Sequence, residues 1–338
     1  MKGLPEVDVS FAPLYTMLLA SIKSKLLLTA IDLKVFNYLS EPESASAVAK
    51  AIRGHPHNTE VFLDGLTACD LLKKRNSLYQ NTTITQTFLV EGSSTYLGEF
   101  FVNQMPWYKP VLDSLSTLIM KGPSSQSQID GESEHVCAQW VGTQANYERS
   151  GIAQSVAEII QELPEFPSFQ RMLDLGGGPG IIGMAIVAAH PTMRGVLFDR
   201  PFVAKAAETY IREYDMQERI EVMGGDFKSE SIGEGYDLVL ASASLNFVKP
   251  AIDSVLKKIY DALNSGGVFV SIADGLTNEG TKPEIMKIGW LSMQLMGQDM
   301  AFERGFVANS MRRVGFKSLD ARTLDAPMGP MDLDIGRK

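Results

Sequence analysis

The sequence is poor in the residues that disulfide frameworks, metal sites and nucleic-acid surfaces require. It has only two cysteines, Cys69 and Cys137, in 338 residues. Two cysteines at this separation form neither a disulfide framework nor a pattern of metal ligands, so we expect a reduced, cytoplasmic protein without a metal ion. Its 40 acidic side chains outnumber 31 basic ones and give a net charge of −9. This excess argues against a nucleic-acid partner, because phosphate binding draws on lysine and arginine.

Long uninterrupted apolar runs are also scarce. The strongest candidate, LYTMLLASIKSKLLLTAI (14–31), contains two lysines. We expect a buried, amphipathic helix there rather than a membrane span of about 20 apolar residues. The first residues, MKGLPEVDVS, carry acidic side chains where a signal peptide has a basic start and an apolar run. The sequence therefore predicts no membrane partner.

The first third of the chain has the pattern of several short helices. Apolar residues recur at helical spacing over 12–39. The segments SASAVAKAI (44–52) and NTEVFLDGLTACDLL (58–72) both begin with residues that cap helices. In the second segment, Asn58 or Thr59 is the predicted N-cap.

A predicted hairpin follows these helices. KKRNSLYQNTTITQTFLV (73–90) has the polar turn and the β-branched residues of two short strands. Helices followed by a hairpin indicate a mostly α, winged-helix-like domain over residues 1–110. Residues 111–165 are then linking helices that contribute to a substrate pocket.

The pattern changes in residues 166–338. Apolar, β-rich runs such as RMLDLGG, RGVLFDR and YDLVLASAS alternate with helical stretches. Such alternation predicts an α/β domain with a doubly wound, mostly parallel sheet and helices on both faces. The tail FKSLDARTLDAPMGPMDLDIGRK (316–338) predicts a terminal antiparallel hairpin.

Three motifs at predicted strand ends indicate a nucleoside-containing ligand. MLDLGGGPG (172–180) is a strand that enters a glycine-rich turn, where a missing Cβ lets the backbone approach a ligand. LFDRP places Asp199 about 20 residues later, where a carboxylate accepts both ribose hydroxyls. These two motifs do not separate NAD from S-adenosylmethionine. In GGDF, Asp226 is placed to meet an adenine amino group and Phe227 to pack on the ring.

The combination D-x-G-G-G-x-G, F-D-x-P and G-G-D-F closely resembles class I S-adenosylmethionine-dependent methyltransferases. More narrowly, it resembles the O-methyltransferase family that includes plant caffeate and bacterial polyketide and carotenoid methyltransferases. The resemblance implies a Rossmann-like methyltransferase domain, an N-terminal winged-helix domain that forms a homodimer, S-adenosylmethionine as cofactor and a small-molecule acceptor. It implies cofactor contacts at Asp174, Gly176, Gly178, Asp199, Arg200, Asp226, Phe227 and Ser242.

The resemblance fails at the catalytic base. After the fourth strand the family reads approximately L-H-D-W, and its His deprotonates the acceptor. The matching position here is Leu245 or Asn246, neither of which accepts a proton at neutral pH. The glutamate that supports the family's His would fall at Met300 or Ala301, two or three residues before Glu303. We therefore predict no catalytic base, with Leu245 and Asn246 as positioning residues.

The histidines present offer no clear substitute. Two lie in the winged-helix region and one ends a cofactor-side helix, so only His135 could approach the pocket, from a loop that is more typical of a surface. The four are His55, His57, His135 and His190.

A missing base is no obstacle when the nucleophile carries no acidic proton. The sequence therefore favours S-methylation of a small thioether acid and is compatible with the 4-methylthio-2-hydroxybutyrate S-methyltransferases of dimethylsulfoniopropionate synthesis. The alternative is C- or O-methylation of an aromatic, quinone or pigment acceptor.

A winged-helix regulator with a cofactor-sensing domain is an alternative of another class. The candidate recognition helix over 58–72 contains three acids and no Lys or Arg, which argues against that regulator.

The resemblance implies that the helices over 139–151 and 285–300 flank the transferred methyl. Both are rich in aromatic residues or Met. They could form an apolar cage suited to a sulfonium, although such residues at helical spacing are also typical of an ordinary core. Gly151 stands where the family often has a Met that packs on an aromatic acceptor. Arg149 or Arg304 could meet a substrate carboxylate or form an outward salt bridge. The candidate cage residues are Trp140, Tyr147, Trp290, Met293 and Met296.

Overall fold

The computed structural model describes residues 4, 6–123 and 134–338, without the side chains of residues 134–139. The chain divides into two units, Met1–Val102 and Asn103–Lys338. The division falls inside helix α5 (Gly98–Lys121), some residues before the predicted boundary at 110.

The first unit combines helices with a small antiparallel sheet. The sheet has the order β1-β3-β2, and β2 and β3 form the predicted hairpin, which is shorter than predicted because its last part, Thr83–Phe88, is helical. A core of Ala, Val, Leu, Ile, Phe and Tyr side chains lies between these elements. The elements are α1 (Ala12–Asp32), η1 (Val35–Tyr38), β1 (Glu43–Ser44), α2 (Ala45–Ala51), α3 (Pro56–Ala68), β2 (Leu72–Arg75), β3 (Leu78–Asn81) and α4 (Thr83–Phe88).

The caps of two helices test the predicted starts. Ser44 caps α2, and its hydroxyl accepts the backbone N–H three residues later at 3.3 Å, as predicted. The predicted start of α3 is wrong. That helix begins at Pro56, and Nδ1 of His55 accepts the N–H of Asn58 at 3.3 Å. Proline at the first helical position has the φ of a helix and no N–H to satisfy, which favours the earlier start.

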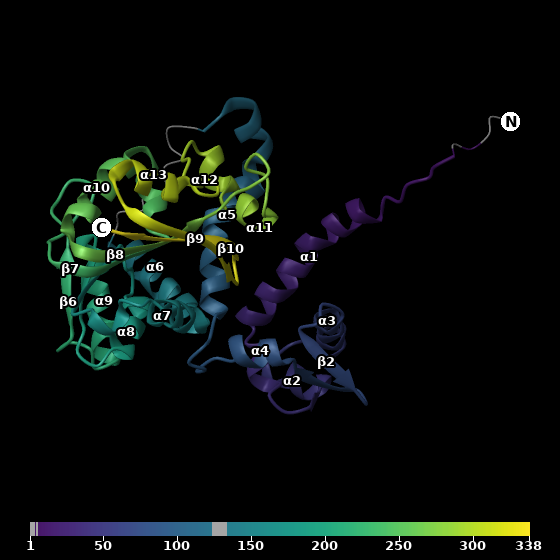
Figure 1. The fold of residues 1–338 in the computed structure, drawn as a ribbon. Helices are drawn as coiled ribbons and strands as arrows, with labels where there is room; N and C mark the ends of the chain where they lie inside the picture. Colours follow the sequence, from purple (N-terminus) through teal and green to yellow (C-terminus); the bar gives the residue numbers. More distant parts are fainter. Residues whose placement is uncertain (1–3, 5, 124–133) are drawn as a thin grey trace. The chain divides into compact units, whose positions relative to one another are not determined.

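Helix α1 is not the buried helix that its sequence predicted. Only Ala30 and Ile31 are buried, and its N-terminal half extends away from α2 and α3 (Figure 1). By length and composition it is the one helix, among the residues that the structure describes, that could cross a membrane. The prediction failed because apolar side chains surround this half of the helix and most of them stay exposed among the described residues. The exposed ones include Phe11, Leu14, Tyr15, Met17, Leu18 and Ile22.

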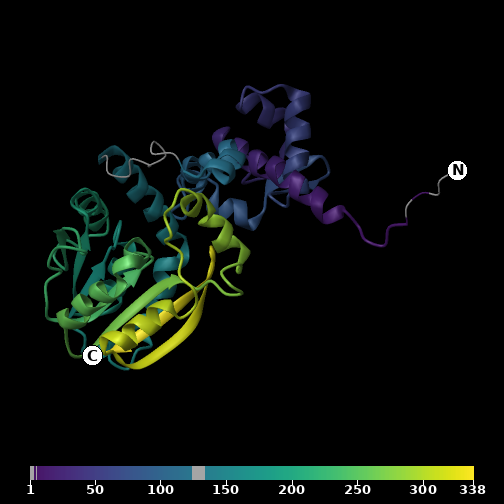
Figure 2. The same ribbon diagram turned by 90° about the horizontal axis from the view of Figure 1, so that it is seen from above.

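The second unit is built on a seven-stranded sheet of order β6-β5-β4-β7-β8-β10-β9. The first five strands in this order are parallel, and β10 pairs antiparallel with β8 and β9. Figure 2 shows β9 and β10 in yellow as the hairpin predicted from the tail. The strands are β4 (Arg171–Leu175), β5 (Arg194–Asp199), β6 (Ile220–Gly224), β7 (Tyr236–Ser242), β8 (Leu263–Asp274), β9 (Lys317–Ala326) and β10 (Gly329–Arg337).

Alternate residues of these strands enter two separate cores, as the pleat of a sheet requires. On β7, Leu238 and Leu240 pack with α7, α8 and α9, whereas Val239 and Ala241 pack with α10 and α13. Helices therefore cover both faces of the sheet, as predicted (Figure 1). The elements are α6 (Glu134–Tyr147), the π-helical η2 (Glu148–Ile152), α7 (Ala153–Gln161), η3 (Phe166–Ser168), α8 (Ile181–Ala189), α9 (Pro201–Glu213), η4 (Leu245–Ala251), α10 (Ile252–Ala262), α11 (Glu284–Gly289), α12 (Leu291–Leu295) and α13 (Phe306–Val314).

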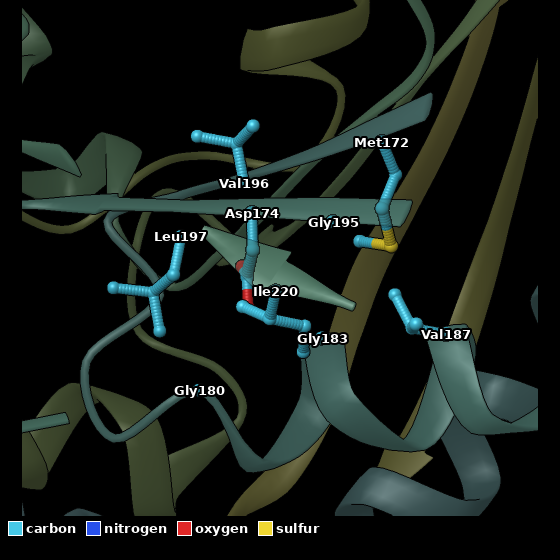
Figure 3. Close-up of a pocket in the computed structure, with 9 residues that line it drawn as sticks. All are labelled: Met172, Asp174, Gly180, Gly183, Val187, Gly195, Val196, Leu197 and Ile220. Atoms are coloured by element: carbon cyan, nitrogen blue, oxygen red, sulfur yellow. The ribbon is translucent and has the colours of Figure 1, made fainter. Parts of the chain in front are cut away.

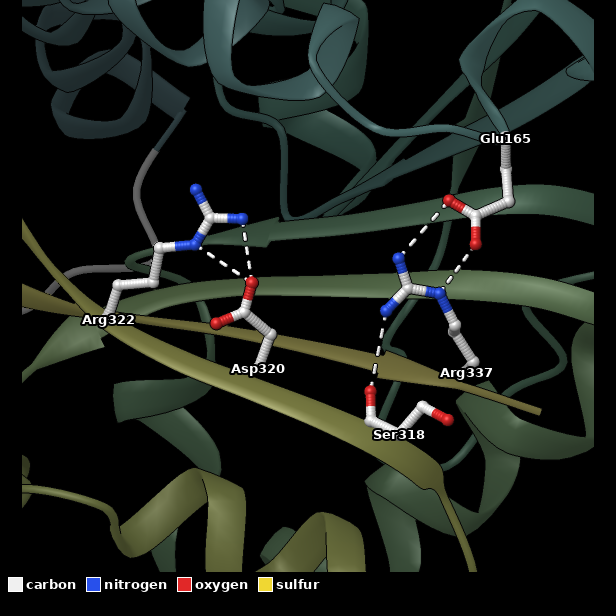
Figure 4. A network of polar contacts seen from close by, with 5 residues as sticks. All are labelled: Glu165, Ser318, Asp320, Arg322 and Arg337. Carbon is white, nitrogen blue, oxygen red and sulfur yellow. Dashed lines mark hydrogen bonds and ion pairs between the residues drawn. The ribbon is translucent and has the colours of Figure 1, made fainter.

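A polar contact ties the antiparallel edge of the sheet to the loop after α7. Arg337, near the end of β10, donates to both carboxylate oxygens of Glu165, at 2.5 and 3.2 Å, and to the carbonyl of Ser318 at 3.4 Å (Figure 4). A separate pair, Arg322 and Asp320, lies on β9. Two parallel hydrogen bonds fix the guanidinium more firmly than one.

Candidate functional site

The glycine-rich turn follows β4 at the carboxyl edge of the sheet, where chain connections diverge to opposite sides. Open α/β sheets bind ligands at such a point. The N–H of Gly176 donates to the carbonyl of Phe198 at 2.7 Å and holds the turn against β5. Gly176 has φ +70°, and a Cβ there would lie 2.4 Å from Cβ of Ser244 and 3.6 Å from the ring of Phe227. Only glycine fits this position.

Asp199 ends β5 beside the same turn. Its Oδ2 accepts the N–H of Gly178 at 2.9 Å, and its Oδ1 accepts the N–H of Arg200 at 2.7 Å. Burial raises the pKa of Asp199, while these two donated hydrogen bonds oppose the rise. These hydrogen bonds bring together three of the predicted cofactor residues, Gly178, Asp199 and Arg200. The side chain of Arg200 is exposed.

Asp174 lies beneath the turn rather than over it. Its carboxyl group points into a cavity of about 10 Å³ below the loop (Figure 3). Oδ2 has no hydrogen-bond partner among the described residues, and burial raises the pKa of Asp174 to about 7. A Cβ at Gly183 would lie 2.5 Å from this oxygen. Asp174 therefore supports the loop from below.

The predicted adenine end lies at the neighbouring strand ends. Asp226 is exposed after β6, and its Oδ1 accepts the N–H of Lys228 at 2.9 Å. Phe227 packs on the core beside α10 and approaches Gly176. Ser242 is half-buried at the end of β7. Of these three side chains, Phe227 is the one that the structure places beside the glycine turn.

Glu148 is a site residue that the sequence did not reveal. It begins η2, and its Oε2 accepts the N–H of Ile182 at the start of α8, at 3.2 Å. Oε1 lies 3.9 Å from the position a Cβ would take at Gly178, and apart from Gly178 and its chain neighbours no other described atom lies within 4 Å of it. Burial, followed by the negative charge of Asp174, raises the pKa of Glu148 well above its usual range. No local motif marks a glutamate in YERSG as buried.

Asn246 is one of the two residues that the sequence offers for the position of the family's His. Its Nδ2 donates to Oδ2 of Asp274 and to the carbonyl of Met300, both at 2.8 Å. Leu245 lies in the core beside α10. Of the two positions left open by the sequence, Asn246 is therefore the one with polar contacts, and its amide cannot accept a proton.

Asp274, at the end of β8, is a second residue that sequence analysis missed. Besides Asn246, its carboxylate accepts hydrogen bonds from the side chain of Trp290 and the backbone of Phe302. Burial raises the pKa of Asp274 to about 6, and these hydrogen bonds oppose the rise. Glu303, the alternative acid considered from the sequence, is exposed.

The described histidines have no contact with Asn246 or Asp274 in the structure, and two of them belong to the first unit. His55 caps α3, and His57 is exposed. His190 is buried, and its Nδ1 accepts the N–H groups of Thr192 and Met193 at 3.2 and 3.0 Å. The side chain of His135 lies outside the described residues, so its approach to the pocket stays a prediction.

The predicted substrate residues form two groups along the chain. The first is Trp140 and Tyr147, and the second is Trp290, Met293 and Met296. Trp290 contacts Asp274 and packs with Leu276, Met286 and Ala301. Trp140 packs edge-on against Trp107, with ring centroids 5.4 Å apart. Burial raises the pKa of Tyr147 to about 12. Met293 and Met296 are half-buried on and just after α12.

Neither predicted arginine is available for a substrate carboxylate in this structure. Arg149 lies over the rings of Tyr210 and Tyr214 and pairs with Glu213 at 2.8 Å, so it faces α9. Nε of Arg304 lies 3.6 Å from Asp332. Both form the salt bridges that the sequence analysis considered as the alternative.

Comparisons with known proteins agree with this architecture. Residues 128–310 match the O-methyltransferase domain, and residues 15–91 match the O-methyltransferase dimerisation domain. The N,N-dimethyltransferase OxyT of Streptomyces rimosus is 28% identical over 77% of this chain and 76% of its own length. Demethylspheroidene O-methyltransferase of Cereibacter sphaeroides is 26% identical over 80% of this chain and 72% of its own length.

Among solved structures, human N-acetylserotonin methyltransferase in complex with S-adenosylmethionine has the same fold, with a TM-score of 0.80 and 22% identity over 99% of both chains. The dimerisation domain supports a homodimer, in which a second copy would cover the exposed side chains of α1. The chain belongs to the O-methyltransferase family and is a methyltransferase that uses S-adenosylmethionine.

Proposed function

We propose that this enzyme methylates a small molecule whose nucleophile loses no proton before it attacks, and that the nucleophile is the sulfur of a thioether acid. The 4-methylthio-2-hydroxybutyrate type of acceptor, used in dimethylsulfoniopropionate synthesis, meets this description. The supporting observation is Asn246. Its amide stands where the family's base is expected, and hydrogen bonds to Asp274 and Met300 hold it there.

Asp274 is poorly suited to replace the missing base. Its carboxylate already accepts hydrogen bonds from Asn246, Trp290 and Phe302, which favour the ionised form and occupy its lone pairs. A buried carboxylate instead favours a positively charged group nearby. Methylation of a thioether produces such a group, a sulfonium, whereas methylation of a phenol produces a neutral ether. The charge of the site therefore supports a sulfur acceptor.

The residues at the glycine turn fit the cofactor. A side chain at Gly178 would fill the space beside the turn, a Cβ at Gly176 would collide with Ser244, and Asp199 presents a carboxylate to a ribose diol. When bound, S-adenosylmethionine supplies an electrophilic methyl on a sulfonium. In the transfer its carbon–sulfur bond breaks, the acceptor sulfur forms the new bond and takes the positive charge, and no proton moves.

The protein's contribution is positioning. Ser244 donates its hydroxyl to the carbonyl of Leu175 at 2.6 Å and holds the end of β7 against the glycine turn. Asn246, two residues later, is fixed by its own hydrogen bonds. A rigid strand edge of this kind holds two reactants in line, and such alignment lowers the activation barrier by several kcal/mol.

A second candidate is N-methylation of an amine. It is favoured by OxyT, which is named an N,N-dimethyltransferase and is similar over most of this chain. A neutral amine also attacks through its lone pair without prior loss of a proton. The absence of a base at Asn246 therefore does not separate an amine from a thioether.

Isotope transfer from labelled S-adenosylmethionine tests the proposal. The acceptors are a thioether acid, its secondary-amine analogue and its phenol analogue, each at pH 6 to 9. We expect turnover of the thioether with a kcat that does not change with pH over this range. Turnover of the phenol alone, with a kcat that rises through one ionisation, would exclude the proposal. A cytoplasmic location stays a prediction.

A further inference from the structure

The carboxylate of Glu148 lies between two features of the cofactor site. One oxygen accepts a backbone N–H at the start of α8, and the other faces the position where Gly178 lacks a Cβ. Gly178 has φ +54°, and among the described residues, apart from Gly178 and its chain neighbours, no other atom lies within 4 Å of that Cβ position. The glycine thus leaves a space against the turn, with a buried carboxylate on its far side.

An ionised Glu148 is stabilised only in part, by backbone hydrogen bonds from Ile181 and Ile182 at the start of α8. Asp174 of β4 and Asp199 of β5 both add negative charge there. On its own element, Tyr147 is a neutral phenol with a raised pKa, and Arg149 turns to Glu213 on α9. The side chains in the first turns of α7 and α8 are uncharged; Gln154 and Ser155 of α7 are polar, and those of α8 are apolar. A ligand that contains a cation would supply the missing charge.

We propose that Glu148 is a cofactor-binding residue whose carboxylate binds the α-ammonium group of S-adenosylmethionine. The proposal uses only the cofactor common to the family and holds whichever acceptor is methylated. The α-ammonium is favoured over the sulfonium because Glu148 lies at the glycine turn and the start of α8. The transferred methyl belongs near Asn246, at the end of β7.

Binding measurements without any acceptor test this assignment, so failure of the thioether proposal would not affect them. Glu148→Gln keeps the size of the side chain and an oxygen that accepts from Ile182. Glu158→Gln is the matched control, because Glu158 is exposed on α7. By titration calorimetry we expect E148Q to bind both S-adenosylmethionine and S-adenosylhomocysteine about tenfold more weakly, by the same factor, since both carry the α-ammonium. E158Q should bind both normally.

A ligand variant gives a second test. Deaminated S-adenosylhomocysteine should bind wild type about tenfold more weakly than its parent and should bind E148Q no more weakly than it binds wild type. In wild type, a cation that binds the carboxylate favours its ionised form. Cofactor binding should therefore release a proton, measurable as a dependence of the binding heat on the buffer, and affinity should rise with pH.

Two outcomes would overturn the assignment. Unchanged affinities in E148Q with a lower melting temperature would make Glu148 only a cap of α8. Weaker binding of S-adenosylmethionine alone would place the carboxylate at the sulfonium. The proton-release experiment needs no variant, so the proposal stays testable if E148Q does not fold.

Discussion

The amide of Asn246 and the carboxylate of Asp274 link the carboxyl ends of two neighbouring parallel strands, β7 and β8, through a hydrogen bond of 2.8 Å. Both side chains are buried, and Asn246 also donates to Met300. The place where the family has a base is therefore a fixed structural link in this chain.

Asn246→Ala should destabilise the protein by about 2–4 kcal/mol, because two buried acceptors lose their donor and each costs about 1–3 kcal/mol. Urea unfolding measures the change. Phe247→Ala is the control, since Phe247 is 53% exposed and adjacent. A loss below about 0.5 kcal/mol in N246A would show that water replaces the amide without cost.

The stability of the cofactor-free protein should fall as pH rises from about 4 to 7. Asp174 has a pKa of about 7 and Asp274 and Asp334 of about 6, against 3.8 for an unperturbed Asp. Between these values the folded state binds more protons than the unfolded state, so each rise in pH favours unfolding. The contribution is complete below the unfolded pKa and is lost as pH passes the folded pKa.

Thermal unfolding at pH 5 and pH 8 measures this slope. Asp274→Asn should reduce it, because the amide does not titrate and its oxygen still accepts from Asn246. Glu158→Gln, which replaces an exposed acid on α7, should leave it unchanged. Equal melting temperatures for wild type at both pH values would contradict the prediction.

Asp199→Ala should weaken binding of S-adenosylmethionine by at least tenfold without unfolding the protein. The carboxylate is the predicted ribose ligand, and charged hydrogen bonds are worth about 1.5–3 kcal/mol each. It also accepts the N–H of Gly178, so the variant should loosen the glycine turn. Calorimetry gives the affinity, with Glu208→Ala on the exposed side of α9 as control. Unchanged affinity would remove Asp199 from the site.

Helix α1 should be part of the dimer interface. Replacing both Leu14 and Leu18, which are 68% and 70% exposed, with Glu puts two charges into the apolar surface that a second copy would bury. Light scattering should then show a monomer. Ile288→Glu, at an exposed position of α11, should leave the dimer intact. A stable dimer of the double variant would place the interface elsewhere.

The sequence predicted those parts of the site that local motifs encode. The glycine turn and Asp199 each follow a β-rich run, so their position at a strand end could be read directly. Glu148 and Asp274 could not be found this way. Glu148 is buried only because η2 packs on α8, and Asp274 meets Asn246 only because β8 pairs with β7.

The exposure of α1 was missed for a related reason. Its apolar composition predicted burial, and composition does not tell whether the covering surface comes from the same chain or from another. The start of α3 was missed because His55 is an uncommon cap, although Pro56 is a signal that could have indicated it.

Asn246→His should add a proton acceptor where this chain has none. The new imidazole would lie beside Asp274, whose negative charge raises the pKa of a neighbouring His above about 6.5. The phenol analogue should then be methylated faster than by wild type, by up to about 10²-fold, with a kcat that rises with pH through the ionisation of the imidazole. The thioether gains nothing from a base, so its kcat should stay flat with pH or fall through altered packing.

Circular dichroism must first show that the variant folds, because position 246 is buried. Phe247→His puts the same group on the exposed neighbour and should leave both acceptors unaffected. A folded N246H variant that methylates the phenol no faster than wild type would show that a base at position 246 does not reach the proton of the acceptor.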